Sequence, residues 1–91
     1  MELRYRNRKI ESFVLRQSKR FGIGSQLGRR LHQLRQAPDL RAVTAIGNCH
    51  RLQKSRYFED NMMALNVTAN WRLCFKIHPE SLEIVEICDY H

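Results

Sequence analysis

The last three residues of the sequence combine side chains that commonly move protons. Asp89, Tyr90 and His91 come directly after an apolar segment that is typical of a buried strand. Imidazole ionises near neutral pH, and a neighbouring phenol or carboxylate can orient it or exchange a proton with it. We therefore expect general acid–base chemistry at this end of the strand. The alternative is that these side chains are exposed to solvent and inert.

A second group of polar side chains lies in the middle of the chain. His50 follows the pair Gly47-Asn48, and Lys54 and Arg56 come soon after it. Lysine and arginine hold phosphate groups, and a histidine beside them can move a proton to or from a phosphate ester. This group is a second candidate for chemistry, and its alternative is an ordinary basic loop.

The spacing of cysteine, histidine and acidic residues argues against a metal centre. Cys74 with His78 and Cys88 with His91 resemble half-sites, but the chain contains no Cys-x-x-Cys pair. No two carboxylates have the spacing that would bring them together for two-metal nuclease chemistry. We expect no metal site and no cofactor. Three cysteines, an odd number, fit a reducing compartment better than a disulfide framework.

A short strand and a helix are expected at the beginning of the chain. Residues 2–6 alternate polar and apolar side chains, which predicts a strand with its apolar side chains facing inward. Asn7 is a suitable N-cap for a helix over about residues 8–20, and Gly22 is a suitable stop signal after it.

A second helix is expected to follow directly. Ser25 can cap it, three leucines form one apolar stripe, and Pro38 ends it. Gly28 lies inside this helix and costs about 1 kcal/mol relative to alanine. That cost implies either close packing at Gly28 or a later helix start. Residues 39–45 are expected to add one short extra turn.

In the second half of the chain, apolar residues recur at every second position, which is the period of a strand. Pairing Val67 with Trp71 keeps the apolar side chains of two strands on one face, and this register requires a three-residue loop over residues 68–70. The same register places Arg72 and Lys76 on the opposite face, where they are available to contact phosphate.

The last strand, over residues 82–88, is apolar at both even and odd positions, which predicts an interior strand buried on both faces. These elements predict an α+β fold. A short N-terminal strand and two helices would pack with a small, mostly antiparallel sheet of three to five strands, the helices on one face of it.

Basic residues dominate the first part of the chain. The net charge is +7, but residues 1–56 carry fourteen Lys or Arg and three acids, whereas residues 57–91 carry two Lys or Arg and six acids. This asymmetry indicates a polyanionic partner, with nucleic acid the first candidate, or an acidic protein. The alternative is a basic surface that only keeps the protein in solution.

The 91 residues are enough for one domain, which we expect to span residues 1–91, and too few for a two-domain enzyme with its own cofactor-binding half. The longest apolar run, residues 62–65, is far shorter than the roughly 20 residues that cross a bilayer. The basic N-terminus is not followed by an apolar signal segment. We therefore expect a cytoplasmic location.

Four segments spread over nearly the whole chain are distinctive. They are Leu3-Arg4-Tyr5-Arg6-Asn7-Arg8-Lys9, Gly47-Asn48-Cys49-His50-Arg51-Leu52, Asn70-Trp71-Arg72-Leu73-Cys74-Phe75 and Val85-Glu86-Ile87-Cys88-Asp89-Tyr90-His91. Together with the order of the elements, they resemble the RelE superfamily of toxins, and within it the HigB branch. The Asn-Trp-Arg hairpin and the C-terminal Asp-Tyr-His are the most specific parts of this resemblance.

The resemblance implies a function as well as a fold. Members of this superfamily are ribosome-dependent, metal-independent endoribonucleases that cut messenger RNA in the decoding site. A partner antitoxin encoded beside the toxin holds them silent. We therefore expect a type II toxin that acts as an mRNA interferase, with mRNA on the ribosome and a helix-turn-helix, HigA-like antitoxin as its partners and with no cofactor.

The resemblance also assigns roles to individual residues. The catalytic histidine of the family falls on His50, and its C-terminal Asp-Tyr-His falls on Asp89, Tyr90 and His91. The sheet arginine of the family falls on Arg72, where it would hold the phosphate.

The family lysine falls close to Lys54. Where the family has Leu-Lys-Gly, this chain reads Leu52-Gln53-Lys54-Ser55, so Gln53 takes the strict position and Lys54 follows it. The basic, glycine-rich turn of the family is also replaced, which leaves Arg56 as the only basic residue of the turn and as a further phosphate contact. These changes support an alternative, a catalytically weakened relative that acts by binding RNA or its antitoxin. A further alternative is a basic RNA-binding domain unrelated to toxins.

Overall fold

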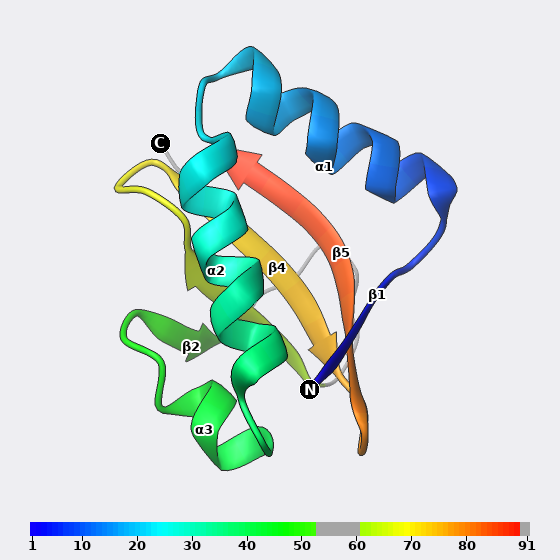
Figure 1. Ribbon diagram of the computed structural model, residues 1–91, viewed down its shortest axis with the longest axis vertical. Helices are drawn as coiled ribbons and strands as arrows, with labels where there is room; N and C mark the ends of the chain where they lie inside the picture. Colours follow the sequence, from blue (N-terminus) through cyan, green and yellow to red (C-terminus); the bar gives the residue numbers. More distant parts are fainter. Residues whose placement is uncertain (53–60, 90–91) are drawn as a thin grey trace.

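The computed structural model describes residues 1–52 and 61–89, which form three helices and one five-stranded sheet (Figure 1). In chain order the elements are β1 (Glu2–Tyr5), α1 (Arg8–Arg20), α2 (Gly24–Gln36), α3 (Leu40–Thr44), β2 (Cys49–Arg51), β3 (Met62–Asn66), β4 (Trp71–Ile77) and β5 (Ser81–Asp89). Among the helices of the described residues, none combines the length and the apolar character needed to span a bilayer.

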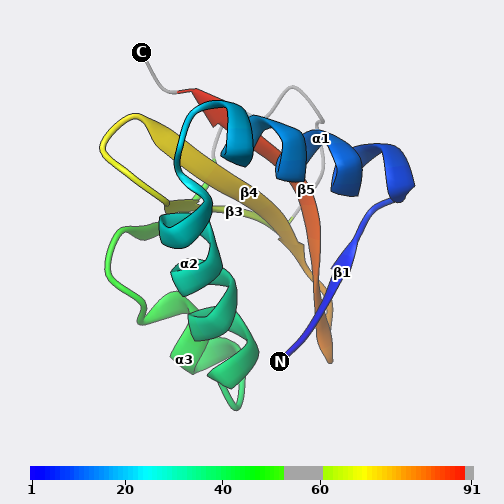
Figure 2. The same ribbon diagram turned by 45° about the horizontal axis from the view of Figure 1, so that its top comes forward.

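The strands of the sheet lie in the order β1-β5-β4-β3-β2. β1 runs parallel to β5, and the other neighbouring pairs are antiparallel. The helices lie on one side of the sheet, and α2 passes in front of β4 in Figure 1; Figure 2 shows the same layers from a second angle. The expected α+β architecture is confirmed, and so is the interior position of the last strand.

α1 begins and ends at the expected signals. The side chain of Asn7 accepts a hydrogen bond from the backbone N–H of Ile10 at 2.9 Å, which satisfies one of the free N–H groups of the first turn. After the helix, Gly22 has a φ of 66°, a left-handed conformation that costs glycine little and other residues more. The cap and the stop predicted for this helix are both confirmed.

α2 begins two residues earlier than expected, and Ser25 does not cap it. The tight turn at Gly22 leads straight into the helix, so Ile23 takes the cap position without a side-chain hydrogen bond. Ile23 is 5% exposed, and burial of its side chain anchors the start of the helix in place of a polar cap. The expected extra turn after α2 is present as α3, with Asp39 accepting from the backbone N–H of Ala42 at 2.9 Å.

Gly28 lies well inside α2 and is exposed. A Cβ atom built on it would meet no atom within 4 Å among the described residues. Neither of the two expected explanations, close packing or a later helix start, is therefore correct. Nothing in the structure requires glycine at this position.

The β3–β4 hairpin has the register expected from its apolar pattern. The backbone N–H of Val67 donates to the carbonyl of Trp71 at 2.8 Å, and Leu65 pairs with Leu73. Arg72 lies opposite Asn66, as the register required. Residues 67–70 lie between the two strands, and the hydrogen bond between Val67 and Trp71 leaves residues 68–70 as the loop beyond that pair. This length keeps the apolar side chains of both strands on the helix side.

The main core lies between the sheet and the helices. Its fully buried side chains come from both layers and include Val14 of α1, Leu34 of α2, Leu73 and Phe75 of β4 and Ile84 of β5. Burying each such side chain contributes roughly 1.5–3 kcal/mol. This core makes the sheet a rigid platform for whatever lies on its other face.

That other face, which we call the open face, carries a smaller apolar cluster. Met62, Ala64, Cys74 and Val85 are buried there. Val85 is the extra residue of a β-bulge, because Cys74 pairs with Glu86 while the next residue of β4 pairs with Ile84. The bulge turns Val85 toward the open face and changes the register between β4 and the end of β5.

Candidate functional site

The open face brings together two of the expected site residues. His50 of β2 lies opposite Ala64 of β3, and Arg72 of β4 lies opposite Asn66, two residues further along β3. Strands that are two apart in a sheet are separated by about 9–10 Å. The small side chain of Ala64 leaves room above β3, and Arg72 reaches across it, so that its Nη1 lies 3.4 Å from His50 Nε2.

The contact places a side chain that can move protons beside a permanent cation. A guanidinium group has only donors, so Arg72 is the donor wherever the two side chains are hydrogen-bonded. A histidine beside such a cation can take a proton from a hydroxyl group, while the cation holds a neighbouring phosphate.

Lys76 lies on the same face as this pair but farther along β4. It is opposite Met62 on one side and Glu83 on the other, and its side chain is half-buried. Four residues along a strand span about 13 Å. Lys76 is therefore placed to contact a different part of a polyanion from the part that Arg72 contacts.

Asp89 is not on the open face. The register places it opposite Trp71, whose side chain packs against the main core on the helix side. Cross-strand partners share a face of the sheet, so the side chain of Asp89 leaves the sheet on the side away from His50 and Arg72. The structure does not bring these three residues together.

Four other expected site residues, Lys54, Arg56, Tyr90 and His91, lie outside the described residues, and their roles stay predictions.

A group of three side chains on the open face was not expected from the sequence. Cys74 of β4 and Glu86 and Cys88 of β5 place their sulfur and carboxylate atoms within 4.8 Å of one another. In the sequence Cys74 and His78 resemble a half-site, an interpretation that the spacing argued against, and the ring of His78 bonds Glu83, with Nε2 2.7 Å from Oε1. The β4–β5 register could have revealed the group, but the bulge at Val85 changes that register without a clear sequence signal.

The chain has no match among protein-family models or curated proteins. Solved structures of similar shape are known. YafQ from Escherichia coli BL21(DE3) is 20% identical with a TM-score of 0.69, and the match covers 97% of this chain and 91% of that chain. The YoeB/ParE toxin from Agrobacterium tumefaciens is 12% identical with a TM-score of 0.67, and 100% of each chain is covered.

The YoeB–YefM complex from Staphylococcus aureus provides a third match, at 15% identity and a TM-score of 0.63, covering 100% of this chain and 97% of that chain. At identities this low, the likeness establishes the fold and not the chemistry. This chain, with its one short parallel strand, two main helices and mixed five-stranded sheet, therefore shares the fold of YafQ and of the YoeB/ParE toxin.

Proposed function

We propose that this protein is the toxin of a type II toxin–antitoxin system and cuts messenger RNA on the ribosome without using a metal ion. The observation that carries the proposal is the contact between His50 and Arg72 on the open face of a RelE-like fold. A base and a phosphate-holding cation are the two groups that RNA cleavage needs first.

The chemistry follows from these groups. His50 takes the proton of a ribose 2′-hydroxyl, and the resulting oxyanion attacks the adjacent phosphate. Arg72 stabilises the negative charge of the five-coordinate phosphate, and Lys76 holds the RNA backbone farther along the strand. A second proton shuttle must then protonate the leaving 5′-oxygen, and His91 is the candidate.

The remaining expected residues complete this scheme as proposals. Lys54 and Arg56 add positive charge around the phosphate, and Tyr90 stacks on a base or orients it. Asp89, which lies on the helix side of β5, would orient a neighbouring group and not the RNA itself.

The partner we propose is an antitoxin encoded beside the toxin. Two of the structures with this fold are toxin–antitoxin complexes, DinJ–YafQ and YoeB–YefM. The sequence segments that resemble the HigB branch favour a HigA-like, helix-turn-helix protein, and the excess of basic residues suits an acidic partner.

A second candidate function is binding without efficient cleavage. Its specific support is Gln53, which stands where the family has a lysine. Such a protein would bind the ribosome, RNA or antitoxin and cut slowly or not at all.

The test is induced expression followed by single-turnover cleavage of ribosome-bound message. We expect the wild-type protein to arrest growth and to cut message in the presence of chelator. His50→Ala and Arg72→Ala should each slow cleavage by roughly 100- to 1,000-fold, which is typical of losing a proton-transferring or charge-stabilising group.

His32→Ala and Arg29→Ala are the matched controls, because both side chains are exposed on α2 in the helix layer. Equal small effects from all four variants would reject the site. A wild-type protein that binds ribosomes and arrests growth without cutting message would favour the binding function.

A further inference from the structure

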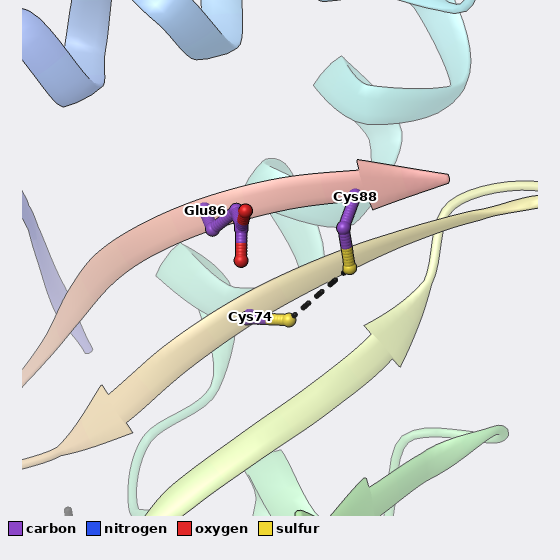
Figure 3. A group of neighbouring side chains, drawn as sticks. All are labelled: Cys74, Glu86 and Cys88. Carbon is purple, nitrogen blue, oxygen red and sulfur yellow. Dashed lines mark hydrogen bonds between the residues drawn. The ribbon is translucent and has the colours of Figure 1, made fainter. Parts of the chain in front are cut away.

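Two thiols and one carboxylate meet on the open face between the interior strands β4 and β5. Figure 3 shows Glu86 and Cys88 reaching from β5 toward Cys74 of β4. The two sulfur atoms are 3.7 Å apart, and the nearest ligand atoms of the three residues all lie within 4.8 Å of one another.

These distances suit a shared cation better than a disulfide. Two thiolates bound at about 2.3 Å to one tetrahedral ion lie about 3.8 Å apart, close to the 3.7 Å between the sulfurs of Cys74 and Cys88. A disulfide would require the sulfurs to approach to about 2.05 Å. The reduced pair therefore already has the spacing of one edge of a tetrahedral site.

The fold holds the three ligands rigidly. Cys74 is directly opposite Glu86, and Cys88 is the next open-face residue of β5. The bulge at Val85 establishes this register, and it lies in a fully buried position. Because the backbone of interior strands is held on both sides by hydrogen bonds, the three ligands are already in position before a metal binds, and binding costs little conformational entropy.

The three ligands differ in exposure. Cys74 is 5% exposed, whereas Cys88 and Glu86 are half-buried. Arg72 lies directly opposite Cys88. The guanidinium of Arg72 reaches across β3 toward His50, with Nη1 3.4 Å from Nε2.

We propose that Cys74, Cys88 and Glu86 form a binding site for a thiophilic divalent cation of the zinc class, with water at the fourth position. Both thiols lose their protons to solvent on binding, so one dication and three anionic ligands give a complex of net charge −1. The cleavage chemistry proposed above needs no metal, so this site is tested by metal binding alone and stands or falls separately.

The test is titration of the reduced, metal-free protein with cobalt(II) and then with zinc(II). We expect one equivalent of cobalt to produce an intense thiolate-to-cobalt charge-transfer band, and one equivalent of zinc to remove it. Cys74→Ser and Cys88→Ser should abolish the band. Glu86→Gln should weaken binding at least about ten-fold, since even outer-shell groups are worth that much.

Cys49→Ser is the matched control and should bind normally. Cys49 lies on β2 opposite Leu65 and packs against the main core on the other face of the sheet. Burial there raises the pKa of its thiol and so disfavours the thiolate. The positive charge of Arg30 opposes this shift only in part. This variant therefore removes a cysteine without touching the proposed ligands.

Thermal unfolding of each metal-free variant shows whether it is folded, and Glu86→Gln on the strand surface keeps the test valid if Cys74→Ser unfolds. The proposal is overturned if the folded, reduced wild-type protein binds no cobalt, or if it only forms a Cys74–Cys88 disulfide in air. Binding that survives in Cys88→Ser, or that is lost in Cys49→Ser, overturns it as well.

Discussion

Glu83 is held between two basic side chains on the open face, at the junction of β1 and β5. Arg6 Nε lies 2.5 Å from Oε2, and His78 Nε2 lies 2.7 Å from Oε1. Burial by itself raises the pKa of Glu83, but the hydrogen bonds and charges of Arg6 and His78 outweigh burial and hold this pKa below its ordinary value. Folding therefore favours the charged carboxylate.

The direction of this shift predicts how stability changes with pH. The stabilising effect of Glu83 is complete above the unfolded-state pKa of about 4.3 and is lost as the pH falls through the lower, folded-state value. We expect Glu83→Gln to lower the free energy of unfolding by about 1–2 kcal/mol at pH 7. The difference from wild type should shrink as urea unfolding is repeated toward pH 4 and below.

Glu80→Gln is the control for this measurement, because Glu80 is an exposed carboxylate in the adjacent turn. It should change stability little at either pH. A destabilisation by Glu83→Gln that stays constant down to acidic pH would mean that packing, and not the charged carboxylate, explains the effect.

The site shows which individual residues a sequence can reveal. His50 and Arg72 were expected from the resemblance and from the hairpin register, and the structure brings their side chains into contact. Asp89 was grouped with them through the C-terminal Asp-Tyr-His of the resemblance, and the strand register places its side chain on the helix side of β5. A motif read from the sequence does not indicate which face of a strand each of its residues occupies, and the role of Asp89 stays a prediction.

At the scale of elements, α2 contains a position that can be improved. Gly28 is exposed within the helix, and an added Cβ would meet no described atom within 4 Å. Glycine in a helix interior costs about 1 kcal/mol relative to alanine. We expect Gly28→Ala to stabilise the protein by about this amount and to raise Tm by roughly 4–8 °C in thermal unfolding.

Gly22→Ala provides the opposite control for that experiment. Gly22 has a φ of 66°, and although its surroundings are equally open, alanine there must adopt a left-handed backbone. We expect it to lower Tm by a comparable amount. If Gly28→Ala also lowered Tm, the prediction would be wrong, because something other than helix propensity would then favour glycine at this exposed position of α2.

The elements were easier to predict than their register. The bounds of α1 followed from Asn7 and Gly22 because local capping chemistry decides them. The β3–β4 register followed from apolar alternation, since a slip by one residue would expose the whole stripe. The β4–β5 register did not follow, because the bulge at Val85 places one apolar residue among others and leaves no signal in composition.

At the scale of the whole molecule, the basic residues of α1 and the site occupy different layers. The exposed basic residues of α1 lie in the helix layer, and they are Arg8, Lys9, Arg16, Lys19 and Arg20. His50 and Arg72 lie on the opposite, open face. The charge asymmetry of the sequence therefore describes the field around the molecule more than it marks the site itself.

This separation predicts that charges on the two layers act on different steps of the proposed reaction. Neutralising Arg16 and Lys19 together as glutamines should slow association with ribosome-bound message by about two- to ten-fold at low salt, because long-range attraction steers encounter. The effect should disappear near 1 M salt, where the screening length falls to about 3 Å, and cleavage of message already bound should be unchanged. Arg72→Gln should instead slow cleavage of the bound message at every salt concentration.

Single-turnover rates measured over a range of protein and salt concentrations separate association from cleavage. A loss of cleavage rate in the Arg16 and Lys19 double variant at saturating protein would mean that the helix layer contacts the reacting RNA, and would contradict the placement of the site on the open face.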